Sequence, residues 1–238
     1  MKKRRYAMLL GLVAALALLM NQNASASVTF NLNTEFSGGQ APAEAAPWVS
    51  AIFTDTGMNQ VTLKLTNLDL NLSENIDEWD FNIDPALDGL LSGGGLTFGA
   101  PTPSSPSTGL MVLTGADAFK ADGDGLYDIR LVFSPGMSGF GPANGFAPGS
   151  SLSFTITGVG LSANSFDFLS SPSGGHGPFF TAAHVQNTTG VGSGGSGWIA
   201  PTGVTTFSAP EPSSILLLGA GLVGLGMLLK RNPLSNRG

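Results

Sequence analysis

Three closely spaced aspartates form the pattern in this sequence that best fits metal binding. Asp122 and Asp124 alternate with glycines, and Asp128 follows four residues later. Calcium prefers several oxygen ligands, and a tight glycine turn can aim carboxylates and carbonyls at one point. Asp122, Asp124 and Asp128 are therefore the candidate calcium ligands. The alternative is an acidic turn leading into a strand, because Lys120 and Leu131 stand where an EF-hand-type loop requires acids.

A second acidic cluster surrounds two aromatic residues. Its carboxylates are those of Glu74, Asp77, Glu78, Asp80, Asp84 and Asp88. Aromatic rings beside polar side chains would suit carbohydrate binding, but alternation along a strand puts Trp79 and Phe81 on one face and Asp80 on the other. We therefore expect both rings to lie in the core. Trp48 and Trp198, beside predicted loops, are the candidates for exposed aromatic residues.

Catalytic chemistry has little support in the sequence. His176 and His184 are the only 2 imidazoles, and no serine stands in the setting of a nucleophile elbow. The two histidines do not form the helical zinc motif, and we expect His184, in an apolar strand, to be buried and hydrogen-bonded. A glycosidase needs only two suitably spaced carboxylates. A polysaccharide hydrolase therefore stays open as an alternative to a protein without catalytic activity.

The central part of the chain is strongly acidic. Lys64, Lys120 and Arg130 are its only basic residues, against all 16 carboxylates of the chain, which gives residues 27–212 a formal net charge of −13. This balance argues against nucleic acid as a partner, because such binding relies on Lys and Arg neutralising phosphates. The chain has no cysteine, so thiol nucleophiles, thiolate metal sites and disulfides are excluded.

Apolar and polar residues alternate through most of this central part, as in half-buried strands. Val61, Leu63 and Leu65 are one example, and the phase slips by one residue at Asn67, which suits a bulge or a short turn. The expected strands cover residues 28–32, 48–54, 61–66, 68–72, 79–84, 96–98, 127–133, 152–157, 166–169, 179–185 and, briefly, 198–199. The predicted fold is all-β, an antiparallel β-sandwich for which a jelly roll is one possible form.

Composition suggests where this domain ends. We place the exported β-sandwich domain at residues 27–185 and a Gly/Ser-rich flexible spacer at 186–209, because residues 192–197 consist only of glycine and serine. Three prolines between residues 101 and 107 predict a long surface loop.

The N-terminal residues have the layout of a secretory signal peptide. Four basic residues between positions 2 and 5 precede an uncharged apolar run from Tyr6 to Met20. Small residues at Ala24 and Ala26 then fit signal peptidase, and we predict cleavage after Ala26. The run is apolar all round, unlike an amphipathic helix at the surface of a domain.

A second uncharged apolar run lies near the other end. Residues 215–229 are a marginal membrane span, which becomes long enough when residues 213–214 are counted and Lys230 and Arg231 reach the head groups. We predict a transmembrane helix at 213–229 with its basic end inside. Residues 219–224 match a GxGxxG fingerprint, but no acidic residue follows, so we exclude a dinucleotide site.

The tripartite tail resembles the PEP-CTERM sorting signal of Gram-negative bacteria. The resemblance rests on Pro210, Glu211 and Pro212, on the short apolar helix after them, and on the basic pair Lys230 and Arg231. It implies recognition by exosortase, a membrane-embedded transpeptidase-like protease, and a link to exopolysaccharide or biofilm. The resemblance covers about the last 30 residues and implies nothing about the central domain. An ordinary tail anchor after a proline-rich linker is the alternative.

Together these features predict a non-catalytic protein that is exported across the inner membrane to the cell surface or extracellular matrix. Signal peptidase and exosortase are the expected partners, with exopolysaccharide as a further one and the membrane contacted through the C-terminal helix. No cofactor is expected apart from calcium. The alternatives are a calcium-dependent adhesin or polysaccharide-binding module, and a polysaccharide hydrolase.

Overall fold

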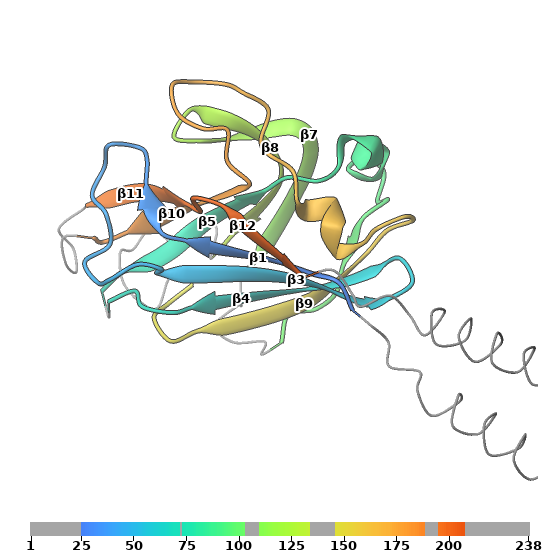
Figure 1. Cartoon of the computed structure of the whole chain (residues 1–238), viewed down its shortest axis with the longest axis horizontal. Helices are drawn as coiled ribbons and strands as arrows, with labels where there is room; N and C mark the ends of the chain where they lie inside the picture. The colour runs from blue at the N-terminus through green and yellow to red at the C-terminus, as the bar shows by residue number, and fades with distance from the viewer. Residues whose placement is uncertain (1–24, 72, 103–109, 134–145, 189–194, 208–238) are drawn as a thin grey trace, which may run out of the picture. The chain divides into compact units, whose positions relative to one another are not determined.

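Two six-stranded antiparallel sheets face each other across an apolar core (Figure 1). The computed structural model describes residues 25–71, 73–102, 110–133, 146–188 and 195–207. Residues 26–208 form one compact unit. The predicted apolar run of the signal peptide and the predicted membrane helix at 213–229 lie outside the described residues. Within the described part of the chain, no helix has the length and apolar character needed to span a membrane.

The first sheet, sheet A, contains in spatial order β12 (Val204–Phe207), β1 (Ser27–Leu32), β3 (Val49–Gly57), β4 (Gln60–Asn67), β9 (Ser151–Thr157) and β6 (Thr97–Phe98). Sheet B contains β2 (Thr34–Glu35), β11 (Ser196–Ala200), β10 (Thr181–Gln186), β5 (Asn75–Phe81), β8 (Asp124–Val132) and β7 (Met111–Ala121). Two short 3-10 helices, η1 (Pro85–Leu90) and η2 (Ala163–Phe166), lie in connections between strands.

The strand pairs are nested along the chain. In sheet A, β1 pairs with β12 and β4 pairs with β9, whereas in sheet B β2 pairs with β11 and β5 pairs with β8. Successive pairs of this series therefore alternate between the two sheets, as though a long hairpin had been wound around the core. This alternation of nested pairs is typical of a jelly roll, although β3 and β10 add hairpin pairs within the two sheets. The predicted all-β antiparallel sandwich is confirmed.

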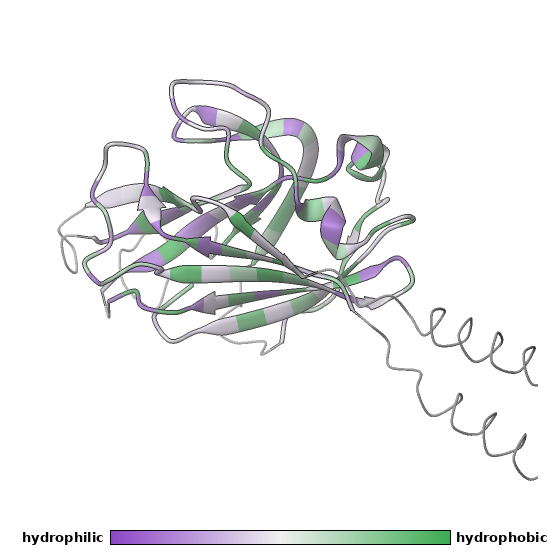
Figure 2. Cartoon of the chain, in the orientation of Figure 1, coloured by the Kyte–Doolittle hydropathy of each residue, from purple (hydrophilic) through white to green (hydrophobic). Residues whose placement is uncertain are grey.

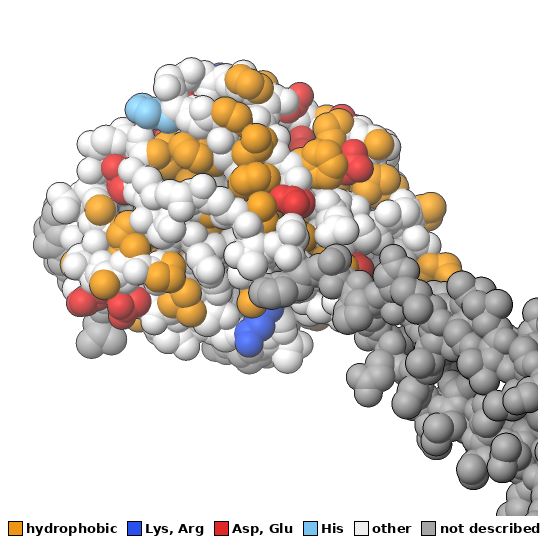
Figure 3. Space-filling model, in the orientation of Figure 1, with side chains coloured by type: hydrophobic (Ala, Val, Ile, Leu, Met, Phe, Trp, Pro, Cys, Tyr) orange, Lys and Arg blue, Asp and Glu red, His pale blue; other side chains and the backbone are white. Residues whose placement is uncertain are grey.

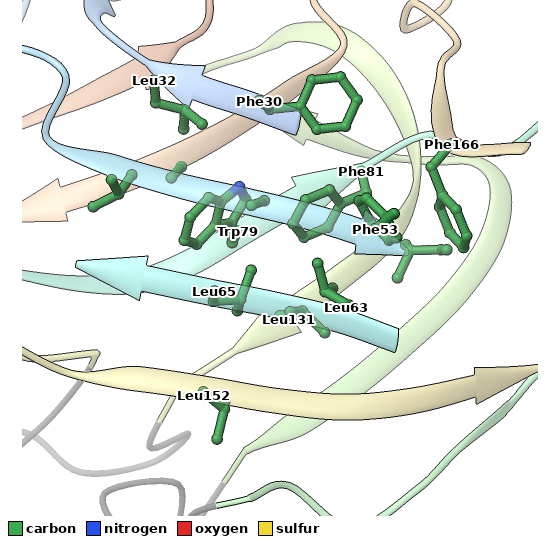
Figure 4. Close-up of a cluster of buried hydrophobic side chains, with 14 of the residues drawn as sticks. Phe30, Leu32, Phe53, Leu63, Leu65, Trp79, Phe81, Leu131, Leu152 and Phe166 are labelled. Carbon is green, nitrogen blue, oxygen red and sulfur yellow. The ribbon is translucent and has the colours of Figure 1, made fainter. Parts of the chain in front are cut away.

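Strand alternation builds the core between the sheets (Figure 2). Aromatic side chains from both sheets meet there, as Figure 4 shows for Phe53 of β3 and Phe81 of β5. The ring centroids of Phe53 and Phe81 lie 5.4 Å apart, and the ring of Phe166 stacks on Phe53 at 3.9 Å. Trp79 is fully buried beside Phe81, so the prediction that both of these rings lie in the core is confirmed.

A smaller apolar cluster packs apart from this main core. It contains Trp198, and Phe119 and Phe179 pack against its edge. Trp198 is only 9% exposed and Trp48 only 7%. The expectation that these two tryptophans are exposed is therefore wrong. The Trp48 ring nitrogen donates a hydrogen bond to the backbone oxygen of Glu44 (2.7 Å), so its polar atom is satisfied inside the fold.

The predicted flexible spacer at 186–209 is wrong for residues 195–207. Residues of β11 pair with β10, and β12 pairs with β1, so both sheets need this segment. Ile199 and Ala200 are fully buried. Composition misled the prediction because glycine and serine also occur in buried strands where neighbouring backbones approach closely. A Cβ at Gly197 would lie 2.7 Å from the backbone oxygen of Gln40.

Two other predicted strands are irregular segments. Strand β4 ends at Asn67. The side-chain oxygen of Asn67 accepts a hydrogen bond from the backbone N–H of Leu70 (3.1 Å). Leu68 is 47% exposed and no strand covers residues 68–71, so the leucine alternation in this described part of the segment does not mark a strand. The expected strand at 166–169 is replaced by the end of η2 and the loop that follows it. Local hydrogen bonds from Asn and Ser side chains compete with strand pairing in such segments.

Candidate functional sites

The predicted calcium ligands lie in and after the turn between β7 and β8, but they do not converge. Asp122 is exposed in the turn, with a positive φ of 50°. The carboxylate of Asp124 lies against His176, and that of Asp128 accepts backbone N–H groups of Ile83 (3.0 Å) and Asp117 (2.8 Å). Within the described ranges, no three His, Cys, Asp or Glu residues are arranged to hold a metal ion.

Asp124 instead connects the β7–β8 turn to a neighbouring loop. Its Oδ1 accepts the backbone N–H of His176 (3.0 Å), and its Oδ2 lies 2.8 Å from His176 Nδ1. These hydrogen bonds from His176 lower the pKa of Asp124. The contact requires a glycine at position 174, because a Cβ there would lie 1.9 Å from Asp124 Oδ1. The nearby turn and loop are also joined by a backbone hydrogen bond from Leu126 to Ser171 (2.9 Å).

Charged side chains gather instead on the outer face of sheet B, around a β-bulge in β5. His184 of β10 pairs with Glu78 and the next residue, Val185, pairs with Ile76, so Asp77 is the extra residue of the bulge. Both Asp77 and Glu78 consequently point away from the core, although they are adjacent in sequence. We call the resulting group the bulge patch; it consists of Asp77, Glu78, Asp80, Arg130, His184 and Gln186.

Arg130 holds one half of the bulge patch together. Its guanidinium makes two hydrogen bonds to the carboxylate of Asp80 (2.8 and 2.7 Å) and an ion pair with Glu78 (2.7 Å). It also donates to the backbone oxygen of Lys120 (2.8 Å) and lies over the ring of Phe119, 5.1 Å from its centroid. Arg130 thereby links β5 and β8 to the far end of β7.

Burial controls the protonation of the two carboxylates beside Arg130. The side chain of Asp80 is fully buried, and burial raises its pKa to about 6, a rise that the bidentate contact with Arg130 limits. Asp80 is therefore ionised at neutral pH. Burial, followed by repulsion from Asp80, raises the pKa of Glu78 to about 7. Near neutral pH, the carboxyl group of Glu78 can therefore gain or lose a proton.

His184 organises the other half of the bulge patch, around Asp77. Its Nδ1 lies 2.9 Å from Asp77 Oδ1, and Gln186 donates a short hydrogen bond to the other oxygen of Asp77. The imidazole stacks on the indole of Trp198, with ring centroids 4.9 Å apart. The expected hydrogen-bonded histidine is found, but the imidazole is half-buried rather than fully buried.

The acidic cluster is evident in the amino-acid sequence, but the way in which the bulge patch forms is not. Strict alternation puts Asp77 and Trp79 on one face of the strand, and only the bulge moves Asp77 to the outer face. Arg130 offered a signal, because it is one of only three basic residues in the central part of the chain.

Comparison with known proteins finds a match for the C-terminal tail of the chain and none for the β-sandwich domain. A family model, the PEP-CTERM protein-sorting motif, matches residues 208–231 and includes Pro210, Glu211, Pro212, Lys230 and Arg231. None of the curated proteins compared with the chain matches it. None of the solved structures matches it either.

The fold and the motif together define an exported, cell-envelope-associated protein with an all-β sandwich domain. The chain carries a PEP-CTERM sorting motif, which implies exosortase as its processing partner. The motif residues lie outside the described residues, as does Ala24 of the predicted signal-peptide cleavage site. Ala26, just before β1, accepts a hydrogen bond from the backbone N–H of Asp55 (2.9 Å).

Proposed function

We propose that this protein is a non-catalytic component of the cell surface or extracellular matrix that associates with exopolysaccharide after sorting by exosortase. The observation that carries the proposal is the direct connection between the folded domain and the sorting motif. β12 ends at Phe207, and the match to the motif begins at residue 208. Processing within the motif would therefore leave the complete sandwich as the exported product.

Charge supports a neutral glycan rather than an anionic one as the partner. The formal net charge of −13 over residues 27–212 opposes association with anionic polymers. On the face shown in Figure 3, acidic side chains are more widespread than basic ones.

The carboxylates of the bulge patch already have hydrogen-bond or ion-pair partners, which supports a non-catalytic role. Asp80 and Glu78 are engaged by Arg130, and Asp77 is engaged by His184 and Gln186. A glycosidase instead needs one carboxyl group free to donate a proton and another free to act as base or nucleophile. The raised pKa of Glu78 is the observation that favours a hydrolase as the second candidate.

Sorting and association are tested on the protein as cells produce it. Intact-mass measurements of the cell-associated and released forms should show loss of residues beyond about position 212, and the protein should co-fractionate with exopolysaccharide. A variant with alanine at Pro210, Glu211 and Pro212 should keep its tail, and a variant with alanine at Ser213 and Ser214 serves as the control. Retention of the chain through Gly238 in the wild type would contradict exosortase processing.

The hydrolase is tested separately. The purified protein should release no reducing ends from the exopolysaccharide of the producing cells over many hours. If reducing ends do appear, and Glu78→Gln abolishes them while Asp122→Asn does not, the hydrolase replaces the non-catalytic proposal.

A further inference from the structure

A shallow cleft opens at one end of the sandwich, beside the start of β3 and the end of β4. It has a volume of about 310 Å³ and is lined by Glu44, Asp69, Leu70 and Asn71. These residues belong to two separate connections, one that leads into β3 and one that follows β4. Acidic side chains gather at this end of sheet A in Figure 3. The volume lies at the lower end of the range for small-molecule sites.

A buried carboxylate holds the two walls of the cleft together. Glu74 is fully buried, and its two oxygens accept the backbone N–H groups of Ala43 and Asn71, each at 2.8 Å. One wall is further fixed by the hydrogen bond from the Trp48 ring to Glu44, and the other by backbone hydrogen bonds from residues 68 and 69 to the Trp48 carbonyl oxygen (2.8 and 3.0 Å). The cleft is thus formed before any ligand arrives, which lowers the entropic cost of binding.

Several of the polar side-chain groups that line the cleft are not used by the fold. Within the described residues, the carboxylates of Glu44 and Asp69 make no hydrogen bond or ion pair with another side chain or backbone group. Asn71 accepts two hydrogen bonds from Ser73 through its side-chain oxygen, which leaves its amide NH₂ group as a donor. Leu70, which is 6% exposed, supplies the apolar part of the lining.

This combination matches the chemistry of a sugar ring. Two carboxylates can accept hydrogen bonds from neighbouring hydroxyl groups, an amide can donate to a ring or hydroxyl oxygen, and a leucine can contact the C–H face. An anionic sugar would be repelled by both carboxylates. Calcium prefers six to eight oxygen ligands, and among the described residues no group of three His, Cys, Asp or Glu side chains is arranged to hold a metal ion.

We infer that this cleft binds a sugar unit of a neutral polysaccharide, with Glu44 and Asp69 as hydrogen-bond acceptors and Asn71 as donor. The inference rests on the proposed association with exopolysaccharide and assigns that association to a site. One cleft binds one sugar weakly, but a polymer offers many copies of the same unit, so binding to a polysaccharide is measurable.

The test uses the protein isolated from producing cells and the exopolysaccharide of the same cells, separated by anion exchange into neutral and anionic fractions. Affinity electrophoresis should show retardation by the neutral fraction and none by the anionic fraction. The double variant Glu44→Gln/Asp69→Asn should bind the neutral fraction about tenfold more weakly, because charge-assisted hydrogen bonds to hydroxyl groups become neutral ones. The control Asp122→Asn/Asp167→Asn also removes two carboxylates, and should bind like the wild type.

Each remaining result argues against the inference. Absence of retardation by the neutral fraction, or equal retardation of the double variant and the wild type, overturns the sugar site. Calorimetric binding of calcium alone that the double variant abolishes, without any glycan binding, would make the cleft a cation site instead. If the double variant still co-fractionates with exopolysaccharide, the site fails while the proposed function stands, and if the wild type does not co-fractionate, the proposed function itself fails. Matching thermal melts establish that both double variants are folded.

Discussion

Arg130 is the residue on which the outer face of sheet B depends. It contacts two carboxylates, one backbone carbonyl oxygen and one aromatic ring. Alternation alone was enough to predict that Trp79 and Phe81 are buried, because their burial follows from the local pattern. The partners of Arg130 could not be predicted in the same way, because β5 and β8 are far apart in sequence and their register depends on the complete sheet.

Replacement of Glu78 should change how stability depends on pH. Its folded pKa of about 7 is above the ordinary value of 4.5, so the folded state holds the proton more tightly, and stability falls as pH rises from about 4.5 to about 7. In Glu78→Gln, the loss of unfolding free energy between pH 5 and pH 8 should shrink by roughly 2 kcal/mol. Urea unfolding across this range measures it, with Glu44→Gln as control. An unchanged pH profile would show that Glu78 titrates normally.

At the level of elements, well-packed strands were predictable and edge segments were not. The strands at 61–66 and 152–157 bury one clean apolar face. β7 was missed because it lies at the edge of sheet B and leaves most of its side chains exposed or half-buried, so its sequence lacks clear alternation. The aspartates after β7 were predicted to bind calcium, whereas in the structure Asp124 attaches a loop to the β7–β8 turn.

Asp124→Asn should weaken that attachment. Hydrogen bonds from His176 lower the folded pKa of Asp124, so its stabilising effect is present above the ordinary value of 3.8 and is lost as pH falls through the lower folded pKa. The variant should lose roughly 1–2 kcal/mol of unfolding free energy at pH 7, and less as the pH falls below the ordinary pKa of 3.8. Hydrogen exchange at the His176 and Gly125 amides should accelerate.

Asp122→Asn, in the same turn, is the matched control because Asp122 is exposed and points to no such partner in the described structure. Equal exchange rates in the Asp124 variant and the wild type would mean that the loop is held without this carboxylate.

At the scale of the whole molecule, the nested pairing makes the last strands as necessary as the first. β12 completes one side of β1, and β11 lies between β2 and β10. The sequence indicated a sandwich but not this order, because each nested pair joins segments whose side chains carry little information about their distant partner. The glycine-rich region before β11 consequently predicts an end of the domain that the structure does not have.

Truncation tests whether the folded domain needs residues 195–207. A chain of residues 27–208 should unfold in one sharp transition, whereas a chain of residues 27–188 should aggregate or melt without cooperativity, because it lacks the fully buried residues Ile199 and Ala200. Differential scanning calorimetry and size-exclusion chromatography measure the difference. A folded 27–188 chain with the same melting temperature would show that 195–207 is dispensable.

The pairing of Ser27 with Phe207 determines how a pulling force would act on the domain. Ser27 also pairs with Thr54, so Phe207 lies near the end of β3. The cleft adjoins Val49 at the other end of β3, about 17 Å away along the strand. A pull between a glycan held in the cleft and a tail held beyond Phe207 would run parallel to the strands of sheet A. Hydrogen bonds between strands stand perpendicular to that line, so they would share the load in shear instead of breaking one after another. Under the proposed association with exopolysaccharide, the domain would therefore resist traction applied along its strands.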